Sequence, residues 1–265
     1  MTTVWRLLVH GPVDGALNMA IDRAVQLCRE AGSAPPTLRL YRWARPTVTL
    51  GRFQPASGVD LGYCTRHGID VVRRFTGGRG VLHVDELTYS VVARTDDGIP
   101  RGTAASYQQL CSALVESYRE LGVDAELTTR DRGESRASAC YLQATQADLS
   151  VGHRKLSGSA QVWSGSTVLQ HGSFAVSRIP GQEVRIFRLD DAQASRLADC
   201  VVTLSDVLGY SPSEEAVASA AIEGFERALD LTMVAGELSA LEAELATELL
   251  VETAAERIPG RGVMT

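Results

Sequence analysis

Two side chains with reactive chemistry stand fifteen positions apart, Cys140 and Lys155. Cys140, in "ASACYLQA", follows the polar stretch "RDRGESRASA" and lies outside any apolar periodicity. A cysteine becomes a nucleophile where a nearby cation or helix N-terminus stabilises its thiolate. Lys155, in "GHRKLSGSAQ", is the only lysine close to it in sequence, at a spacing that suits neighbouring strands or a loop folding back. Because loop cysteines are more often inert and strand lysines are more often solvated edge residues, the residues alone leave both interpretations open.

A second candidate is the glycine-rich stretch "RRFTGGRGVLH", residues 73–83. Missing side chains would let a ligand lie against the backbone, with N–H groups facing it, although a plain hairpin turn is the common alternative. The stretch is neither GxxxxGK[ST] nor GxGxxG, which argues against a Walker-type phosphate loop and a dinucleotide fingerprint. Arg73 and Arg74 are adjacent on a predicted strand, so only one of them can face a given pocket. His83 is a candidate lining residue, whereas His171 in "LQHGS" is interpreted as a hydrogen-bonded structural histidine.

The elements that must position these residues follow from periodicity. Apolar residues at helical spacing predict helices over 14–32 and 106–122, and they place Cys28 and Cys111 on the buried faces. Alternating residues predict strands, clustered rather than alternating with helices, over 35–43, 47–53, 70–75, 80–84, 87–94, 147–163 and 166–176. The clusters indicate one α/β (α+β) domain over residues 1–265, with mixed or antiparallel sheets flanked by helices.

The last third of the chain is predicted to be mostly helical, with C-terminal helices over about 211–257 and no separate accessory domain. The stretch "SPSE" fits a capping box that begins this region, with Ser211 as N-cap, Pro212 at the first helical position and Glu214 at the third.

Composition excludes several classes of function. The 265 residues carry a net charge of −6, which argues against duplex nucleic acid as a partner. No apolar run reaches 18 residues and the N-terminus lacks a secretory pattern, so we expect a cytoplasmic protein with no membrane partner. The five cysteines form no CxxC pair, and no His, Asp or Glu grouping has metal-ligand spacing, so we expect neither a disulfide framework nor a metal site.

Five segments, in this order, resemble the lipoate–protein ligase/octanoyltransferase superfamily, which is related to the biotin–protein ligases. They are "NMAIDRA" at 18–24, "LRLYRW" at 38–43, "GRFQ" at 51–54, "RRFTGGRGVLHVDELTYSV" at 73–91 and "GHRKLSGSAQ…VLQHGS" at 152–173. The chain is most similar to the M-type octanoyltransferases, because Cys140 stands where that group places a cysteine ahead of the "GRKxxGSAQ" lysine.

The resemblance implies a biotin/lipoate ligase-like catalytic domain with a hydrophobic tunnel for an acyl chain. It also implies the roles of the site residues. Cys140 would be the nucleophile, and Lys155 would favour its thiolate and orient the acyl carbonyl. Backbone and side chains that would bind substrate are those of Arg74, Thr76, Gly77, Gly78, His83, Gly158, Ser159 and Ala160.

The reaction implied is ping-pong transfer of an octanoyl group from octanoyl-acyl carrier protein to a lysine of a lipoyl domain, the first step of endogenous lipoate assembly. Exchanging one thioester for another is nearly isoenergetic and forming an amide is downhill, so no cofactor is expected. The acceptors would be glycine cleavage H protein or the E2 subunits of 2-oxoacid dehydrogenases.

Three alternatives remain open at this point. An ATP-dependent lipoate–protein ligase would use ATP and Mg²⁺ to activate free lipoate, with Lys155 contacting the activated carboxylate. An octanoyl amidotransferase would use the same Cys140 and Lys155 and take its acyl group from another lipoyl domain. A catalytically silent acyl-binding protein would bind octanoate without forming a thioester.

Overall fold

A six-stranded mixed sheet forms the centre of the computed structural model, which describes residues 3–128 and 148–255. Its strand order is β10-β11-β6-β2-β1-β12, with parallel pairing at β12–β1 and β1–β2 and antiparallel pairing elsewhere. The strands run over β1 Thr3–Val13, β2 Thr37–Trp43, β6 Asp85–Arg94, β10 Ser159–Ser164, β11 Thr167–Ser177 and β12 Leu231–Ala235. The predicted mixed α/β architecture is confirmed.

Two small sheets stand beside the large one. One has the order β4-β3-β5 and the other β7-β8-β9. Their strands are β3 Thr47–Leu50, β4 Asp70–Arg73, β5 Val81–His83, β7 Glu126–Leu127, β8 Leu149–Val151 and β9 Arg154–Ser157. The first carries the glycine-rich segment between β4 and β5, and the second carries Lys155 on β9, so each small sheet brings one sequence candidate toward the large sheet.

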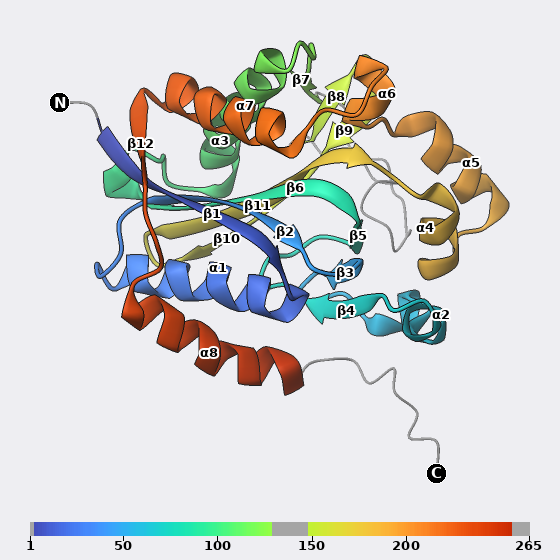
Figure 1. Ribbon diagram of the computed structural model, residues 1–265, viewed down its shortest axis with the longest axis horizontal. Coiled ribbons are helices and arrows are strands. Elements are labelled where there is room, and N and C mark those ends of the chain that lie inside the picture. Colours follow the sequence, from blue (N-terminus) through green and yellow to red (C-terminus); the bar gives the residue numbers. More distant parts are fainter. Residues whose placement is uncertain (1–2, 129–147, 256–265) are drawn as a thin grey trace.

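Helices cover both faces of the large sheet, with α3 and α7 on one face and α1 and α8 on the other (Figure 1). The helices run over α1 Gly15–Glu30, α2 Leu61–Arg66, α3 Thr103–Glu120, α4 Pro180–Ile186, α5 Asp191–Cys200, α6 Leu204–Leu208, α7 Glu214–Leu229 and α8 Ala240–Ala255. Single 3₁₀ turns occur at Ala56–Gly58 and Thr95–Asp97. Of these helices, α1 and α3 match the periodicity of the sequence and bury Cys28 and Cys111 as expected.

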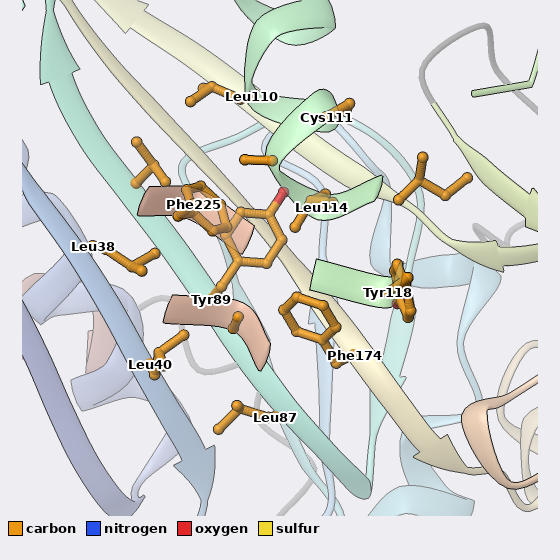
Figure 2. Close-up of a cluster of buried hydrophobic side chains, with 14 of the residues drawn as sticks. Leu38, Leu40, Leu87, Tyr89, Leu110, Cys111, Leu114, Tyr118, Phe174 and Phe225 are labelled. Carbon is orange, nitrogen blue, oxygen red and sulfur yellow. The ribbon is translucent and has the colours of Figure 1, made fainter. Parts of the chain in front are cut away.

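The main core lies between the sheet and the α3–α7 pair. Tyr89 of β6 and Phe174 of β11 point from the sheet toward α3 and α7, where Phe225 and Tyr118 meet them (Figure 2). The Tyr89 ring lies 6.0 Å from Phe174 in an edge-on arrangement and 5.8 Å from Phe225 in a tilted one. Alternation along the strands makes this face apolar, while the opposite face packs on α1.

One expectation for the C-terminal region, the position of the helix N-cap, is wrong. Helix α7 begins at Glu214 with Ser213, not Ser211, as its N-cap, because the Ser213 hydroxyl accepts a hydrogen bond from the Ala216 amide at 3.2 Å. The region also contains strand β12, which lies between α7 and α8 in the sequence and pairs in parallel with β1. Thr232 and Val234 lie among β-favouring residues whose run is too short for periodicity to separate from the helices around it.

Candidate active site

The described residues enclose a cavity of about 140 Å³ between the large sheet and the glycine-rich segment. Its apolar lining comes mainly from Met19, Tyr41, Trp43 and Val81. Its polar lining includes Arg74, His83, Asp148, Ser159 and His171. The cavity therefore has the composition of a small-molecule site, apolar with a few convergent polar groups.

Lys155 is buried directly behind one wall of this cavity. Its side chain is 5% exposed, and its ammonium lies 2.9 Å from a carboxylate oxygen of Asp148, which lines the cavity. A Cβ atom at Gly158 would lie only 3.1 Å from the Lys155 Nζ, so the missing side chain makes room for the ammonium. The burial removes the interpretation of Lys155 as a solvated edge residue.

The strand that follows Lys155 is fixed from the α3 side. The Tyr107 hydroxyl donates to the Ser159 carbonyl at 2.5 Å, and the Tyr89 hydroxyl lies 2.6 Å from the Ser159 Oγ. Burial is the largest effect that raises the pKa of Tyr107, so its hydroxyl stays protonated and available to donate. Gly158, Ser159 and Ala160, three of the residues predicted to bind substrate, all line the cavity.

The glycine-rich segment is braced by Arg74. The guanidinium donates to the carbonyls of Gly77 and Arg79 at 2.7 and 2.8 Å, and Arg74 and Gly78 line the cavity. Arg73 turns to the other side and donates to the Gly51 and Gln54 carbonyls, so only one of the two arginines faces the cavity, as expected for adjacent strand residues.

Thr76 and Gly77 are not among the residues that line the cavity. The Thr76 side chain is fully buried behind the wall, where its hydroxyl meets His171 and Arg74. Gly80, which lies between Gly77 and strand β5, packs closely against the ring of Phe187. A Cβ atom at Gly80 would lie 2.5 Å from that ring. Packing thus accounts for one of the three glycines without any ligand.

His83 lines the cavity from β5 and is held on three sides. Its ring stacks on Trp43 with centroids 4.2 Å apart, its Nδ1 lies 2.7 Å from Glu86, and its Nε2 lies 2.9 Å from the Thr49 hydroxyl. Burial alone would raise the pKa of Glu86, but the His83 charge and hydrogen bonds from His83, Ser173 and Thr88 outweigh it and lower that pKa.

Sequence reasoning missed Asp22 of α1, the residue at the centre of a network of buried, hydrogen-bonded polar side chains. Asp22 is 1% exposed, forms an ion pair with Arg39 at 2.8 Å, and accepts hydrogen bonds from Tyr41 and Ser90. Burial would raise its pKa, but the Arg39 charge and the hydrogen bonds lower it. The available signal was Asp22 itself, a charged residue on the apolar face of an amphipathic helix.

His171 and Asp148 also line the cavity, although the sequence analysis did not assign either of them to the site. His171 is hydrogen-bonded as expected of a structural histidine, but it also lines the cavity, 2.7 Å from the Thr76 hydroxyl. The only signal for Asp148 in the sequence is that it is a polar residue directly before the strand that begins at Leu149. Cys140 lies outside the described residues, and so does the polar stretch "RDRGESRASA" that precedes it.

Comparison with known proteins identifies the family of this chain. Residues 14–226 match the model of the lipoyl protein ligase A/B catalytic domain. The chain belongs to this family. It is 38% identical to octanoyltransferase LipM of Kyrpidia tusciae over 95% of the chain and 97% of that protein, and 39% identical to the LipM of Symbiobacterium thermophilum over 95% and 96%.

Solved structures of the lipoyl ligase family share its fold. A lipoate-protein ligase A bound with ATP superposes with a TM-score of 0.79 at 26% identity, covering 93% of this chain and 94% of that one. A putative lipoate protein ligase from T. acidophilum with bound lipoic acid gives 0.76 at 26% identity, covering 93% and 95%. With octanoyltransferases as its sequence relatives, the chain is an acyltransferase of the lipoate-ligase-like type.

The described residues of this lipoyl ligase family member contain no group of three or more His, Cys, Asp or Glu side chains placed to hold a metal ion. Within the same ranges, none of the helices is both long and apolar enough to cross a membrane.

Proposed function

We propose that this chain transfers an octanoyl group from octanoyl-acyl carrier protein to a lysine of a lipoyl domain, through a thioester on Cys140. The observation that carries the proposal is the burial of Lys155 at the wall of a largely apolar cavity. The similarity to octanoyltransferases over most of the chain supports the choice of acyl group. Glycine cleavage H protein and E2 lipoyl domains are the proposed acceptors.

The cavity supplies binding energy for an acyl chain. Burying a methylene group gains about 0.8 kcal/mol, so the apolar lining formed by Met19, Tyr41 and Trp43 can contribute roughly 5 kcal/mol to binding of an octanoyl chain. The carbonyl at the head of the chain would then lie among the polar lining groups.

Lys155 acts as a fixed hydrogen-bond donor and point charge. In its ion pair with Asp148 the ammonium is held in one position and is not an attacking amine. A positive charge in a buried, water-poor site stabilises a nearby thiolate and the oxyanion that forms when the thiolate attacks. Gly78 and Ser159 line the same cavity, and their backbone N–H groups are the proposed additional oxyanion donors.

The chemistry balances without a cofactor. The Cys140 thiolate attacks the carbonyl of the donor thioester, a tetrahedral oxyanion forms, and the carrier's thiolate leaves and takes up a proton. The neutral ε-amine of the acceptor lysine then attacks the acyl-enzyme, loses a proton, and expels the Cys140 thiolate. ATP and Mg²⁺ have no role in either step.

One feature of the composition makes the intermediate easy to identify. Lys155 is the only lysine in the sequence, and the other basic residues are arginines and histidines. An octanoyl group on the enzyme can therefore form a stable amide only at Lys155 or the N-terminus, whereas a thioester on cysteine is cleaved by neutral hydroxylamine. Cys200, the exposed thiol among the described residues, provides a matched control.

The test is intact-mass measurement after mixing the enzyme with octanoyl-acyl carrier protein and no acceptor. We expect one octanoyl adduct that hydroxylamine removes, present in Cys200→Ser and absent in Cys140→Ser. Near wild-type transfer to a lipoyl domain by Cys140→Ser would overturn the thioester step. Parallel reactions decide between donors: free octanoate with ATP tests the ligase alternative, and octanoyl-lipoyl domain tests the amidotransferase. Binding of octanoate with no adduct under any condition would favour the catalytically silent alternative.

A further inference from the structure

The guanidinium of Arg74 is held on both sides by a threonine. Its Nε donates to the Thr76 hydroxyl at 3.1 Å, and its Nη1 donates to the hydroxyl and the carbonyl of Thr49 at 3.3 and 3.1 Å. With the bonds to the Gly77 and Arg79 carbonyls, each of its five N–H groups has an oxygen acceptor. Arg74 therefore shapes the wall of the cavity rather than offering a free fork to a ligand.

Each of these threonines is bonded in turn to a histidine. Thr76 Oγ1 lies 2.7 Å from the Nε2 of His171, and Thr49 Oγ1 lies 2.9 Å from the Nε2 of His83. The opposite ring nitrogen of each histidine faces a buried carboxylate, Nδ1 of His171 facing Asp22 at 3.4 Å and Nδ1 of His83 facing Glu86 at 2.7 Å. A carboxylate–histidine–threonine chain thus reaches Arg74 from either side.

The chain through His171 has a defined direction. Burial is the largest effect that lowers the pKa of His171, so the ring is neutral at pH 7 and carries a single N–H. The Asp22 carboxylate can only accept, which places the proton on Nδ1 and leaves Nε2 to accept from the Thr76 hydroxyl. The Thr76 oxygen in turn accepts from Arg74, which can only donate.

Asp22 is a firm anchor for this chain. Its carboxylate binds Arg39, Tyr41 and Ser90, so it is fixed to strands β2 and β6 as well as to its own helix. Movement of His171 away from Thr76 would leave buried polar groups without partners, which is costly.

The arrangement resembles a catalytic triad in outline, yet Thr76 is no nucleophile. Its exposed fraction is zero and it does not line the cavity. What the chain controls is the backbone beyond Arg74. Because a peptide unit is planar and trans, holding the Gly77 carbonyl on Arg74 fixes the direction of the Gly78 N–H.

We propose that His171 is a positioning residue for acyl transfer, which acts in its Nδ1–H tautomer by relaying the fixed position of Asp22 through Thr76 and Arg74 to the Gly77–Gly78 peptide. The activity part of this proposal rests on the octanoyl transfer proposed above. The tautomer does not, and it is measured separately.

The first experiment records long-range ¹H–¹⁵N spectra of the five imidazole rings in ¹⁵N-histidine-labelled enzyme at pH 7.5, with His171→Gln used to assign the ring. We expect a protonated Nδ1 and an unprotonated Nε2 at His171. A ring with its single proton on Nε2, or with both nitrogens protonated, would overturn the proposal whatever reaction the enzyme catalyses.

The second experiment measures single-turnover acylation of Cys140 by octanoyl-acyl carrier protein at rising donor concentrations. Losing this relay in His171→Ala should lower the limiting rate about ten- to hundredfold, with little change in the half-saturating donor concentration. His171→Gln, whose amide keeps an acceptor for Thr76 and a donor for Asp22, should recover most of the rate. His67→Gln, at an exposed histidine, should match the wild type.

The Thr76 variants keep the test decisive if His171→Ala does not fold. Thr76→Ser retains the hydroxyl and should retain the rate, while Thr76→Val removes it and should lose the rate as His171→Ala does. Because His171 and Thr76 belong to the same chain of hydrogen bonds, the His171→Ala/Thr76→Val double variant should be no slower than either single variant. A positioning role would be contradicted if His171→Gln folded but acylated as slowly as His171→Ala. It would also be contradicted if Thr76→Val and Thr76→Ser acylated at equal rates. Absence of acylation in the wild type would instead refute the proposed reaction and leave the tautomer result standing.

Discussion

The Lys155 ammonium lies 2.9 Å from the Asp148 carboxylate, and the two side chains are 5% and 3% exposed. Removing one partner of such a pair takes the opposite charge away from a buried ionised group. We therefore expect Lys155→Met to lower the free energy of unfolding by about 3–5 kcal/mol, and the Lys155→Met/Asp148→Leu double variant to lose less. Urea denaturation measures both, and both variants should lack acyl transfer.

The exposed pair of Arg42 and Glu214 is the control for this prediction. These side chains are 43% and 40% exposed, so Glu214→Gln should change stability by about 0–1 kcal/mol. If Lys155→Met cost no more than this, the buried pair would not be a structural element of the site.

The size of the cavity should limit the length of the acyl chain. Met19 of α1 is 2% exposed and lines the cavity, so Met19→Ala enlarges it and should shift the preferred donor from eight carbons toward ten or twelve. A loss of about 2–5 kcal/mol in stability should accompany the change. Rates with donors of graded length measure the shift. Met233→Ala, on β12 away from the cavity, should leave the length preference unchanged.

Two neighbouring glycines should respond differently to alanine. Gly78 has a φ of +93°, and a Cβ there would lie 2.7 Å from the Arg74 guanidinium, so Gly78→Ala should cost about 1–3 kcal/mol and disturb the cavity wall. At Gly77 no atom beyond the adjoining residues lies within 4 Å of the added carbon, so Gly77→Ala should change stability by less than about 0.5 kcal/mol. Equal losses of stability in the two variants would contradict this account.

His10 should make stability depend on pH. Arg39 donates to the His10 Nδ1 at 2.8 Å, and burial followed by the Arg39 charge lowers the pKa of His10 from 6.5 to about 4. Between these values the unfolded chain binds a proton that the folded chain does not, so stability falls as the pH falls. His10→Gln should reduce this slope by up to about 1.4 kcal/mol per pH unit, measured by denaturation at several pH values. Identical slopes would rule out His10 as the source.

Much of the site's framework was predictable because its signals are local. The helical stripe that contains Cys28 and the glycines beside Arg74 can be read within a short window of sequence. The opposite facing of Arg73 and Arg74 also follows from strand geometry alone. Their roles toward substrate stay predictions.

The polar network was not predictable, because its contacts join distant segments. His171 meets Asp22 across 149 positions and Thr76 across 95, and no pattern within a window links them. The segments that carry the family resemblance, including "NMAIDRA", "LRLYRW" and "RRFTGG", meet in this network through Asp22, Arg39 and Arg74.

The pairing of β12 with β1 has a consequence for how this protein is made. Thr3 aligns with Leu231, and the buried Glu242 of α8 binds Arg6 of β1, so one edge of β1 is without its partner until synthesis has passed Leu231. During translation that edge is a bare row of backbone donors and acceptors, open to other nascent chains or to chaperones. Late arrival of β12 would cover this edge of β1, which makes the segment that carries β12 a determinant of folding yield as well as of stability.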